Sequence, residues 1–273
     1  MKTSHFPSWR ASLLAVGALV LAGCAAVQPP APAPANETKD RITASDEPEA
    51  QRRARARMEL ASAYFSRGQM TTALDQVKLA IVADPLYGQA FNLRGLIYAS
   101  LGEQQLAEES FKRSLQLNPR DADAMHNYGW YLCQQRRYPA ASTLFNQAMA
   151  VPQYRGVART LLAQGVCQAF AGDLEASADT LQRAYEMEPT NPFAATNLAE
   201  VLYRRGEYQR ARFFMRRVNS QAEVSNAQTL WLAARIEQRL GNQPGAQDFG
   251  TQLRNRFPDS REAALFARGA YDE

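Results

Sequence analysis

The sequence repeats a pattern of two short amphipathic helices every 34 residues, and this period constrains the fold more than any other feature. In residues 88–121, apolar side chains recur three and four positions apart, as on a helix with one buried face. Gly102 separates the two predicted helices, because glycine readily adopts the left-handed turn that ends a helix. Pro119 follows the second helix and cannot donate the amide hydrogen bond that would continue it. The small residues Gly95 and Ala107 predict that the two helices approach closely.

The pattern recurs along most of the chain and resembles the tetratricopeptide repeat, in which an aromatic residue is followed by Gly, Tyr, Gly, Ala, Phe and Pro at fixed offsets. The predicted repeats cover residues 54–87, 88–121, 122–157, 158–191, 192–225 and 227–260, and the third is lengthened at 151–157. Residues 261–271 are predicted to form a capping helix, because the final repeat would otherwise expose its apolar face. The resemblance implies an all-α fold, a right-handed tetratricopeptide-repeat superhelix with a concave inner surface.

The first 23 residues have the pattern of a lipoprotein signal peptide. Lys2 and Arg10 form a positive start, and the apolar residues 11–22 are too few for a membrane-spanning helix, which needs about 20. The stretch ends in Leu-Ala-Gly-Cys, which resembles a bacterial lipobox and implies that Cys24 is lipidated. An ordinary signal peptide or an uncleaved anchor are the alternatives. The residue after the cysteine is Ala25 rather than Asp, which resembles the pattern of lipoproteins sorted to the outer membrane, so we expect a protein that is lipid-anchored there and faces the periplasm.

A tether is predicted between this anchor and the repeats. Residues 24–50 contain the run PPAPAPA followed by a polar, acidic stretch. Its prolines favour extended polyproline II, a semi-rigid spacer. The folded domain is therefore expected over residues 51–273.

Composition and motifs argue against catalysis and nucleic-acid binding. The net charge is +4, and two of these charges lie on Lys2 and Arg10 in the signal peptide, which leaves too little for an argument for nucleic acid. Three cysteines without a CxxC spacing exclude a zinc framework. Outside the signal peptide the sole histidine is His126, seven residues from Cys133, which is about 10 Å along a helix and too far for a nucleophile–base pair. We predict no enzyme activity, no cofactor, no metal and no small-molecule substrate.

Cys133 and Cys167 occupy positions twelve and ten of adjacent repeats, on equivalent first helices. At about 100° per residue, side chains two positions apart leave parallel helices in roughly opposite directions, as facing side chains must. A disulfide between the third and fourth repeats is therefore one hypothesis for an oxidising periplasm, and a pair of small buried thiols is the other.

A protein-binding groove is implied by the repeat family, in which positions two, five, nine and twelve of each first helix line the concave face. Carried onto this sequence, the candidate groove residues are Met58, Phe65, Gln89, Asn92, Leu96, His126, Trp130, Leu162, Val166, Phe193 and Tyr203. This surface is largely apolar, and an exposed apolar groove usually binds a partner. Some of these side chains would alternatively only pack against the next helix. The Lys/Asn/Arg carboxylate clamp of some relatives is not matched, so a strand or helix held by apolar contacts fits better.

Two basic clusters remain, at residues 51–57 and on the arginines of the fifth repeat (Arg204, Arg205, Arg210, Arg212, Arg216 and Arg217). Such runs are most often solvated faces, and an acidic partner surface or anionic lipid is the alternative.

Lipobox, proline tether and about six repeats together resemble the type IV pilus biogenesis and stability lipoproteins, the PilW/PilF family. The segments NYGWYLCQQRRY and LLAQGVCQAFAGD, at residues 127–138 and 161–173, look like the paired-cysteine region of that family. The resemblance implies a pilotin that binds secretin subunits and promotes their outer-membrane localisation and multimerisation, and so permits twitching motility. The alternative is a repeat lipoprotein that serves as an adaptor for outer-membrane protein assembly or for peptidoglycan hydrolases.

Overall fold

The computed structural model describes residues 47–272, and the predicted signal peptide, lipidation site and most of the tether lie outside them. In this part of the chain the structure is all helical, as predicted. The thirteen helices are α1 (Glu49–Ser66), α2 (Met70–Ala83), α3 (Gly88–Ser100), α4 (Gln104–Leu117), α5 (Ala122–Gln134), α6 (Tyr138–Ala150), α7 (Val157–Ala171), α8 (Leu174–Met187), α9 (Pro192–Arg204), α10 (Tyr208–Asn219), α11 (Ala227–Arg239), α12 (Gln243–Arg256) and α13 (Arg261–Ala267). None of these helices is long and apolar enough to cross a membrane.

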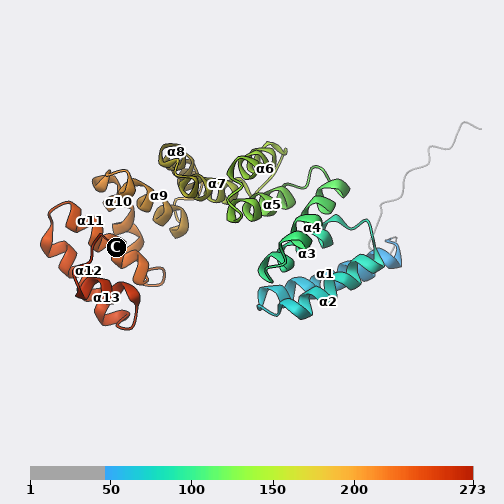
Figure 1. Ribbon diagram of the computed structural model, residues 1–273, viewed down its shortest axis with the longest axis horizontal. Helices are drawn as coiled ribbons and strands as arrows, with labels where there is room; N and C mark the ends of the chain where they lie inside the picture. The colour runs from blue at the N-terminus through green and yellow to red at the C-terminus, as the bar shows by residue number, and fades with distance from the viewer. Residues whose placement is uncertain (1–46, 273) are drawn as a thin grey trace, which may run out of the picture. The chain divides into compact units, whose positions relative to one another are not determined.

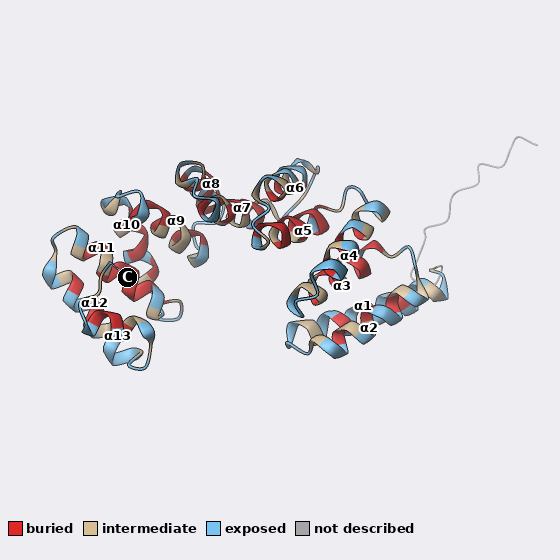
Figure 2. Cartoon of the chain, viewed as in Figure 1, coloured by how far each residue is buried: buried red, intermediate tan, exposed pale blue. Residues whose placement is uncertain are grey.

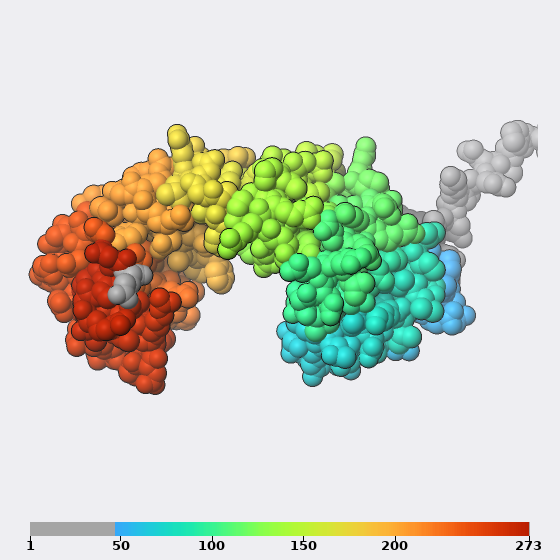
Figure 3. All heavy atoms as spheres, viewed as in Figure 1, coloured from blue at the N-terminus to red at the C-terminus, as the bar shows by residue number. Residues whose placement is uncertain are grey.

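Consecutive helices pack in pairs, and the pairs follow one another along a curved path within residues 46–273, which form one compact unit (Figures 1 and 3). The odd-numbered helices α3, α5, α7, α9 and α11 also contact one another in series, whereas the even-numbered helices α2 to α12 of this described unit do not. The row of odd-numbered helices is therefore the tighter, inner row, and its free face is the concave side. Figure 2 shows the buried residues gathered where helices meet and the exposed residues on the outer faces.

A left-handed residue makes the turn inside each helix pair. Gly102 has φ of 80°, which confirms the predicted break between α3 and α4. In the third pair Arg136 takes the same place with φ of 59°. A side chain in this conformation costs about 1–2 kcal/mol relative to glycine, so the third turn depends on the packing around it.

The close approach of α3 and α4 is confirmed at Gly95, but its partner is a ring rather than Ala107. A Cβ atom added to Gly95 would lie 2.8 Å from the ring of Phe111. Gly129 stands in the same relation to Phe145, and Gly165 to Leu181. The three large side chains are wholly buried, because the missing Cβ of each glycine lets them lie against the facing helix.

The capping helix is shorter than predicted. The prediction placed it over residues 261–271, but α13 ends at Ala267, because Gly269 has φ of 68° and turns the chain. Ala263, Leu265 and Phe266 of α13 are buried and cover the last core, together with Leu230 and Leu253.

Gly95→Ala should lower the free energy of unfolding by about 1–3 kcal/mol, because the added methyl group must displace the buried ring of Phe111. Without a steric clash, alanine would stabilise the helix by up to about 1 kcal/mol relative to glycine. A decrease in the free energy of unfolding therefore identifies the clash as the cause. Urea unfolding followed by circular dichroism measures it. Gly88→Ala on the same helix is the matched control, since its Cβ would meet nothing nearer than 3.5 Å and should change stability little. Equal effects of the two substitutions would contradict this account of the packing.

Candidate protein-binding groove

Two recesses lie on the face formed by the odd-numbered helices. The first recess, of about 250 Å³, is lined by Met58, Gln89, Asn92, Leu93, Leu96, Asp121 and Asp123. The second recess, of about 360 Å³, is lined by His126, Trp130, Arg159, Leu162, Ala163, Val166, Phe193 and Asn197. The structure thus brings nine of the eleven predicted groove residues into two clusters. Leu93, Ala163 and Asn197 also line the recesses. They were missed because each stands at position six of its repeat, one residue after a position carried over from the repeat family.

The second recess is the more apolar of the two, and α5, α7 and α9 build it. Trp130, Leu162 and Val166 are half-buried, with one side of each packed against a hydrophobic core. Phe193 is different, since 70% of its surface is exposed at the start of α9. A large aromatic side chain left in solvent beside an apolar recess is a typical anchor for a partner's side chain.

His126 forms the floor of this recess and belongs to a buried polar chain. Its Nδ1 lies 2.9 Å from the hydroxyl of Thr160, which is in turn 2.9 Å from the hydroxyl of Tyr154. Burial lowers the pKa of His126 to about 4; the positive charge of Arg159 lowers it further, and Asp123 opposes the shift. The imidazole is therefore neutral at pH 7 and adds hydrogen-bonding capacity rather than charge.

A charged and polar stretch separates the two recesses. Arg159 at the rim of the second recess forms an ion pair with Asp123 at the rim of the first, with 2.5 Å between Nη2 and Oδ1. The side-chain amide of Asn127 donates to Oδ1 of Asn92 at 3.2 Å. The two recesses are thus joined by charged and polar groups that can bind the polar backbone of a peptide.

The two remaining predicted residues lie outside the recesses. Phe65 is half-buried near the end of α1 and packs against the first core. Tyr203 is buried, with 7% of its surface exposed, because the guanidinium of Arg235 lies 4.6 Å above its ring. The sequence positions were right for the concave side, but side chains of the next repeat cover this end of it.

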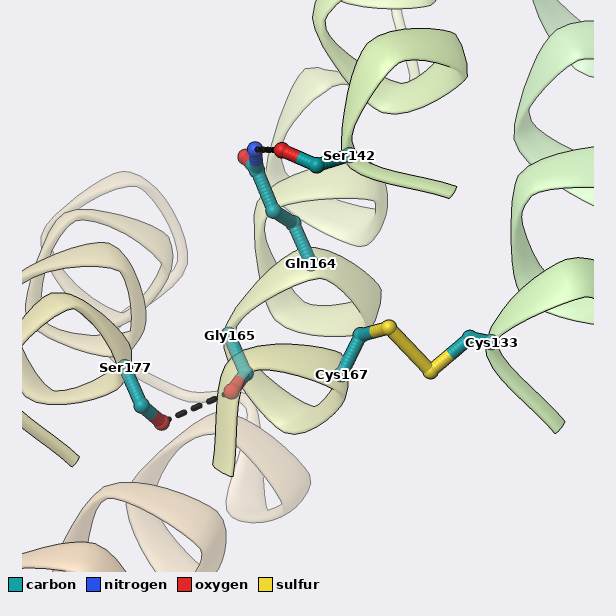
Figure 4. Close-up of a disulfide and its surroundings, with 6 residues drawn as sticks. All are labelled: Cys133, Ser142, Gln164, Gly165, Cys167 and Ser177. Carbon is teal, nitrogen blue, oxygen red and sulfur yellow. Dashed lines mark hydrogen bonds between the residues drawn. A yellow bond between two sulfur atoms is a disulfide. The ribbon is translucent and has the colours of Figure 1, made fainter. Parts of the chain in front are cut away.

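A disulfide joins Cys133 of α5 to Cys167 of α7 (Figure 4). The two Cα atoms are 5.8 Å apart, within the usual range for a disulfide, and both side chains are buried. The bond closes a loop of 34 residues and ties the third repeat to the fourth. A loop of this length typically gives about 2–4 kcal/mol of stabilisation.

Four of the six arginines of the fifth repeat pair with carboxylates, but most of the six are exposed, as on a solvated face. The carboxylate of Glu237 on α11 is 1% exposed and pairs with Arg212 at 2.8 Å and Arg216 at 3.4 Å. The amide of Asn242 donates to its other oxygen at 2.7 Å. The ion pairs of Glu207 hold Arg205 and Arg210. A buried carboxylate needs such partners, so Glu237 accounts for two of the six arginines, Arg212 and Arg216.

Within residues 47–272 no group of three or more potential metal ligands comes together. The chain belongs to the tetratricopeptide-repeat family: segments 88–121, 110–141, 129–192 and 171–236 each match a tetratricopeptide repeat, and together they span more than half of the chain.

Two proteins of type IV pilus biogenesis are similar to it. The type IV pilus assembly protein PilF of Pseudomonas aeruginosa is 25% identical over 211 residues, which cover 77% of this chain and 83% of PilF. The crystal structure of PilW, a widely conserved type IV pilus biogenesis factor, superposes with a TM-score of 0.74 at 29% identity and covers 78% of this chain and 98% of PilW. The solved PilF structure has the same fold, with a TM-score of 0.70 at 23% identity over 81% of this chain. The chain is homologous to PilF and structurally similar to PilW, and shares with them the tetratricopeptide-repeat fold of type IV pilus biogenesis proteins.

The stability of the protein should fall between pH 6.5 and pH 4 partly through His126. The pKa of the folded-state imidazole is about 4 and the unfolded one is about 6.5, so in this window the unfolded chain binds more protons. The stabilising effect of the neutral form is complete above pH 6.5, and about 2–3 kcal/mol of it is lost by pH 4.5. Urea unfolding at pH 7 and pH 4.5 measures the loss. His126→Gln cannot titrate and should lose correspondingly less stability; an identical pH dependence would exclude His126 as the cause.

Proposed function

We propose that this protein is a lipid-anchored outer-membrane protein of type IV pilus biogenesis that faces the periplasm and acts as a pilotin. It binds secretin subunits, promotes their outer-membrane localisation and multimerisation, and has no catalytic step of its own. The proposed partners are the secretin subunit, which is a protein, and the outer membrane, which holds the lipid on Cys24.

The observation that carries this proposal is the similarity to PilF and PilW over nearly the whole repeat unit. The match to PilW includes 98% of that structure, so it concerns the full array rather than one shared repeat. Tetratricopeptide-repeat scaffolds of pilus biogenesis are typically non-catalytic and mediate protein–protein interaction. The lipobox-like sequence ending at Cys24 and the disulfide both fit an oxidising compartment outside the cytoplasm.

The two recesses suggest how a secretin segment would bind. An apolar side chain of the partner enters the second recess against Trp130 and the exposed ring of Phe193. Asn197 at the same recess and Asn92 at the first supply amide donors and acceptors for the partner's main chain. Binding through these apolar contacts and amide hydrogen bonds needs no catalytic residue.

Deleting the gene should abolish secretin multimers while porins assemble normally, because a pilotin serves one client. Immunoblots of secretin and of porins in outer-membrane fractions measure both. Complementation with Cys24→Ala should leave the protein outside the membrane fraction and restore secretin localisation poorly, since the thiol that would carry the lipid is missing. General porin loss or a cell-division defect would instead favour the adaptor for outer-membrane assembly or peptidoglycan hydrolases.

Phe193→Asp should weaken secretin capture at least about tenfold, because a carboxylate would then stand where the partner buries an apolar group. Phe193 is a cleaner probe than Trp130 or Leu96, which pack against the cores and would also change stability. Phe213→Asp is the matched control, since this ring is 61% exposed on α10 and lines neither recess. Capture by purified protein, with thermal unfolding alongside, measures the difference. Equal capture by the two folded variants would count against the groove.

A further inference from the structure

The residues that follow α13 return to the concave side and lie on α11. The ring of Tyr271 stacks on Trp231 with 5.3 Å between centroids and 21° between planes. It also meets the edge of Phe266 at 6.2 Å and 90°. Burial of the hydroxyl raises the pKa of Tyr271, as expected for a ring held in a recess rather than in solvent.

Polar groups of α11 hold the same short segment beside the ring. Nε of Arg235 donates to the main-chain oxygen of Tyr271 at 3.0 Å. Arg239 pairs with the carboxylate of Asp272, with 2.5 Å between Nη2 and Oδ1. Trp231, Arg235 and Arg239 are four residues apart in turn, so they form one stripe along a single face of the helix. Along the stripe, Trp231 contacts the aromatic ring, Arg235 the main-chain oxygen and Arg239 the carboxylate.

The stripe joins the groove positions of the sixth repeat to the last core. Trp231 and Arg235 stand at positions five and nine of the sixth repeat, the positions that line the groove in the earlier repeats. Arg235 lies over the ring of Tyr203, and Nε of Arg239 donates to the Tyr203 hydroxyl at 3.4 Å. Trp231 belongs to the last core and Tyr271 packs against it, whereas the contacts of Arg235 and Arg239 with the segment are polar and lie outside that cluster.

The ion pair that holds Asp272 is weak enough for a competing segment to replace it. The Arg239–Asp272 pair is exposed, at 45% and 80% of the two side chains, and such pairs contribute at most about 1 kcal/mol. The segment is held by the ring contacts of Tyr271 with Trp231 and Phe266, and by its attachment to α13, which keeps it at a high local concentration beside the stripe. A segment of a partner bound elsewhere on the same groove would gain the same advantage.

We propose that the Trp231–Arg235–Arg239 stripe is a second peptide-binding site, which takes an extended segment carrying an aromatic residue followed by an acidic one. The chain's own Tyr271 and Asp272 occupy it until a partner segment of the same chemistry replaces them. The proposal rests on the proposed function only in assigning the groove to a protein partner. The site does not depend on the second recess or on the identity of that partner.

The test uses the peptide acetyl-Gly-Ala-Tyr-Asp-amide as the probe and the unit 46–273, whose hydrophobic cores are formed by its own residues. A chain ended at Gly269 should bind the peptide, and the intact unit should bind it at least about tenfold more weakly, because its own segment competes. Peptide NMR line broadening or fluorescence anisotropy of a labelled probe measures the affinity. Peptides with Ala in place of Tyr, or Asn in place of Asp, should bind the shortened chain several-fold more weakly.

Arg239→Gln in the shortened chain should reduce binding by a similar factor, and circular dichroism checks that each chain is folded. If the shortened chain unfolds, Asp272→Lys in the intact unit supplies the same test, because charge reversal should free the stripe and raise affinity for the probe. Equal binding by the intact and opened chains, or no binding by a folded opened chain, would overturn the proposal. Secretin capture takes no part in these measurements, so their failure is distinct from failure of the pilotin function.

Discussion

The contact between a helix glycine and a large side chain of the next helix sets the spacing of the second, third and fourth helix pairs. Gly95, Gly129 and Gly165 each leave out the Cβ that Phe111, Phe145 or Leu181 would otherwise strike. The two helices of a pair can then pack at short range, and the same contact repeated in successive pairs gives similar units that stack in one direction. The inner row of odd-numbered helices, and with it the groove, depends on this spacing.

The groove is the part of the first helices that stacking leaves uncovered. Side chains that complete the cores, such as Leu161 and Leu198, are wholly buried. Side chains one or two positions away from such core residues contact the core on one side and solvent on the other. Trp130 and Leu162 are therefore half-buried in the second recess. The disulfide of Cys133 and Cys167 fixes α5 against α7, two of the three helices that build this recess. A binding surface made of partly packed side chains is thereby held in one shape before a partner arrives.

Charge along the face changes from one end to the other. Acidic groups stand at the first recess, the Asp123–Arg159 pair stands between the recesses, and arginines stand at α11. Glu237 and Glu207 pair with four of the six arginines of the fifth repeat, so two carboxylates neutralise this solvated cluster only in part. Arg159 stands at the second recess, and Arg235 and Arg239 stand at α11, where the chain's own acidic residue covers Arg239.

The sequence by itself determined the repeat. Its 34-residue period, Gly102 and the apolar positions define two helices per unit, since they follow from local propensity and from which residues must be buried. The resemblance to the repeat family named Met58, Gln89, Asn92, His126, Trp130 and Phe193 as groove residues, and they line the two recesses. Only the tertiary structure decided which of these are accessible, because burial depends on the adjacent repeat. Tyr203 is covered by Arg235, 32 residues further along, and the segment after α13 folds back on α11, two contacts between residues distant in the chain that no period within one repeat encodes.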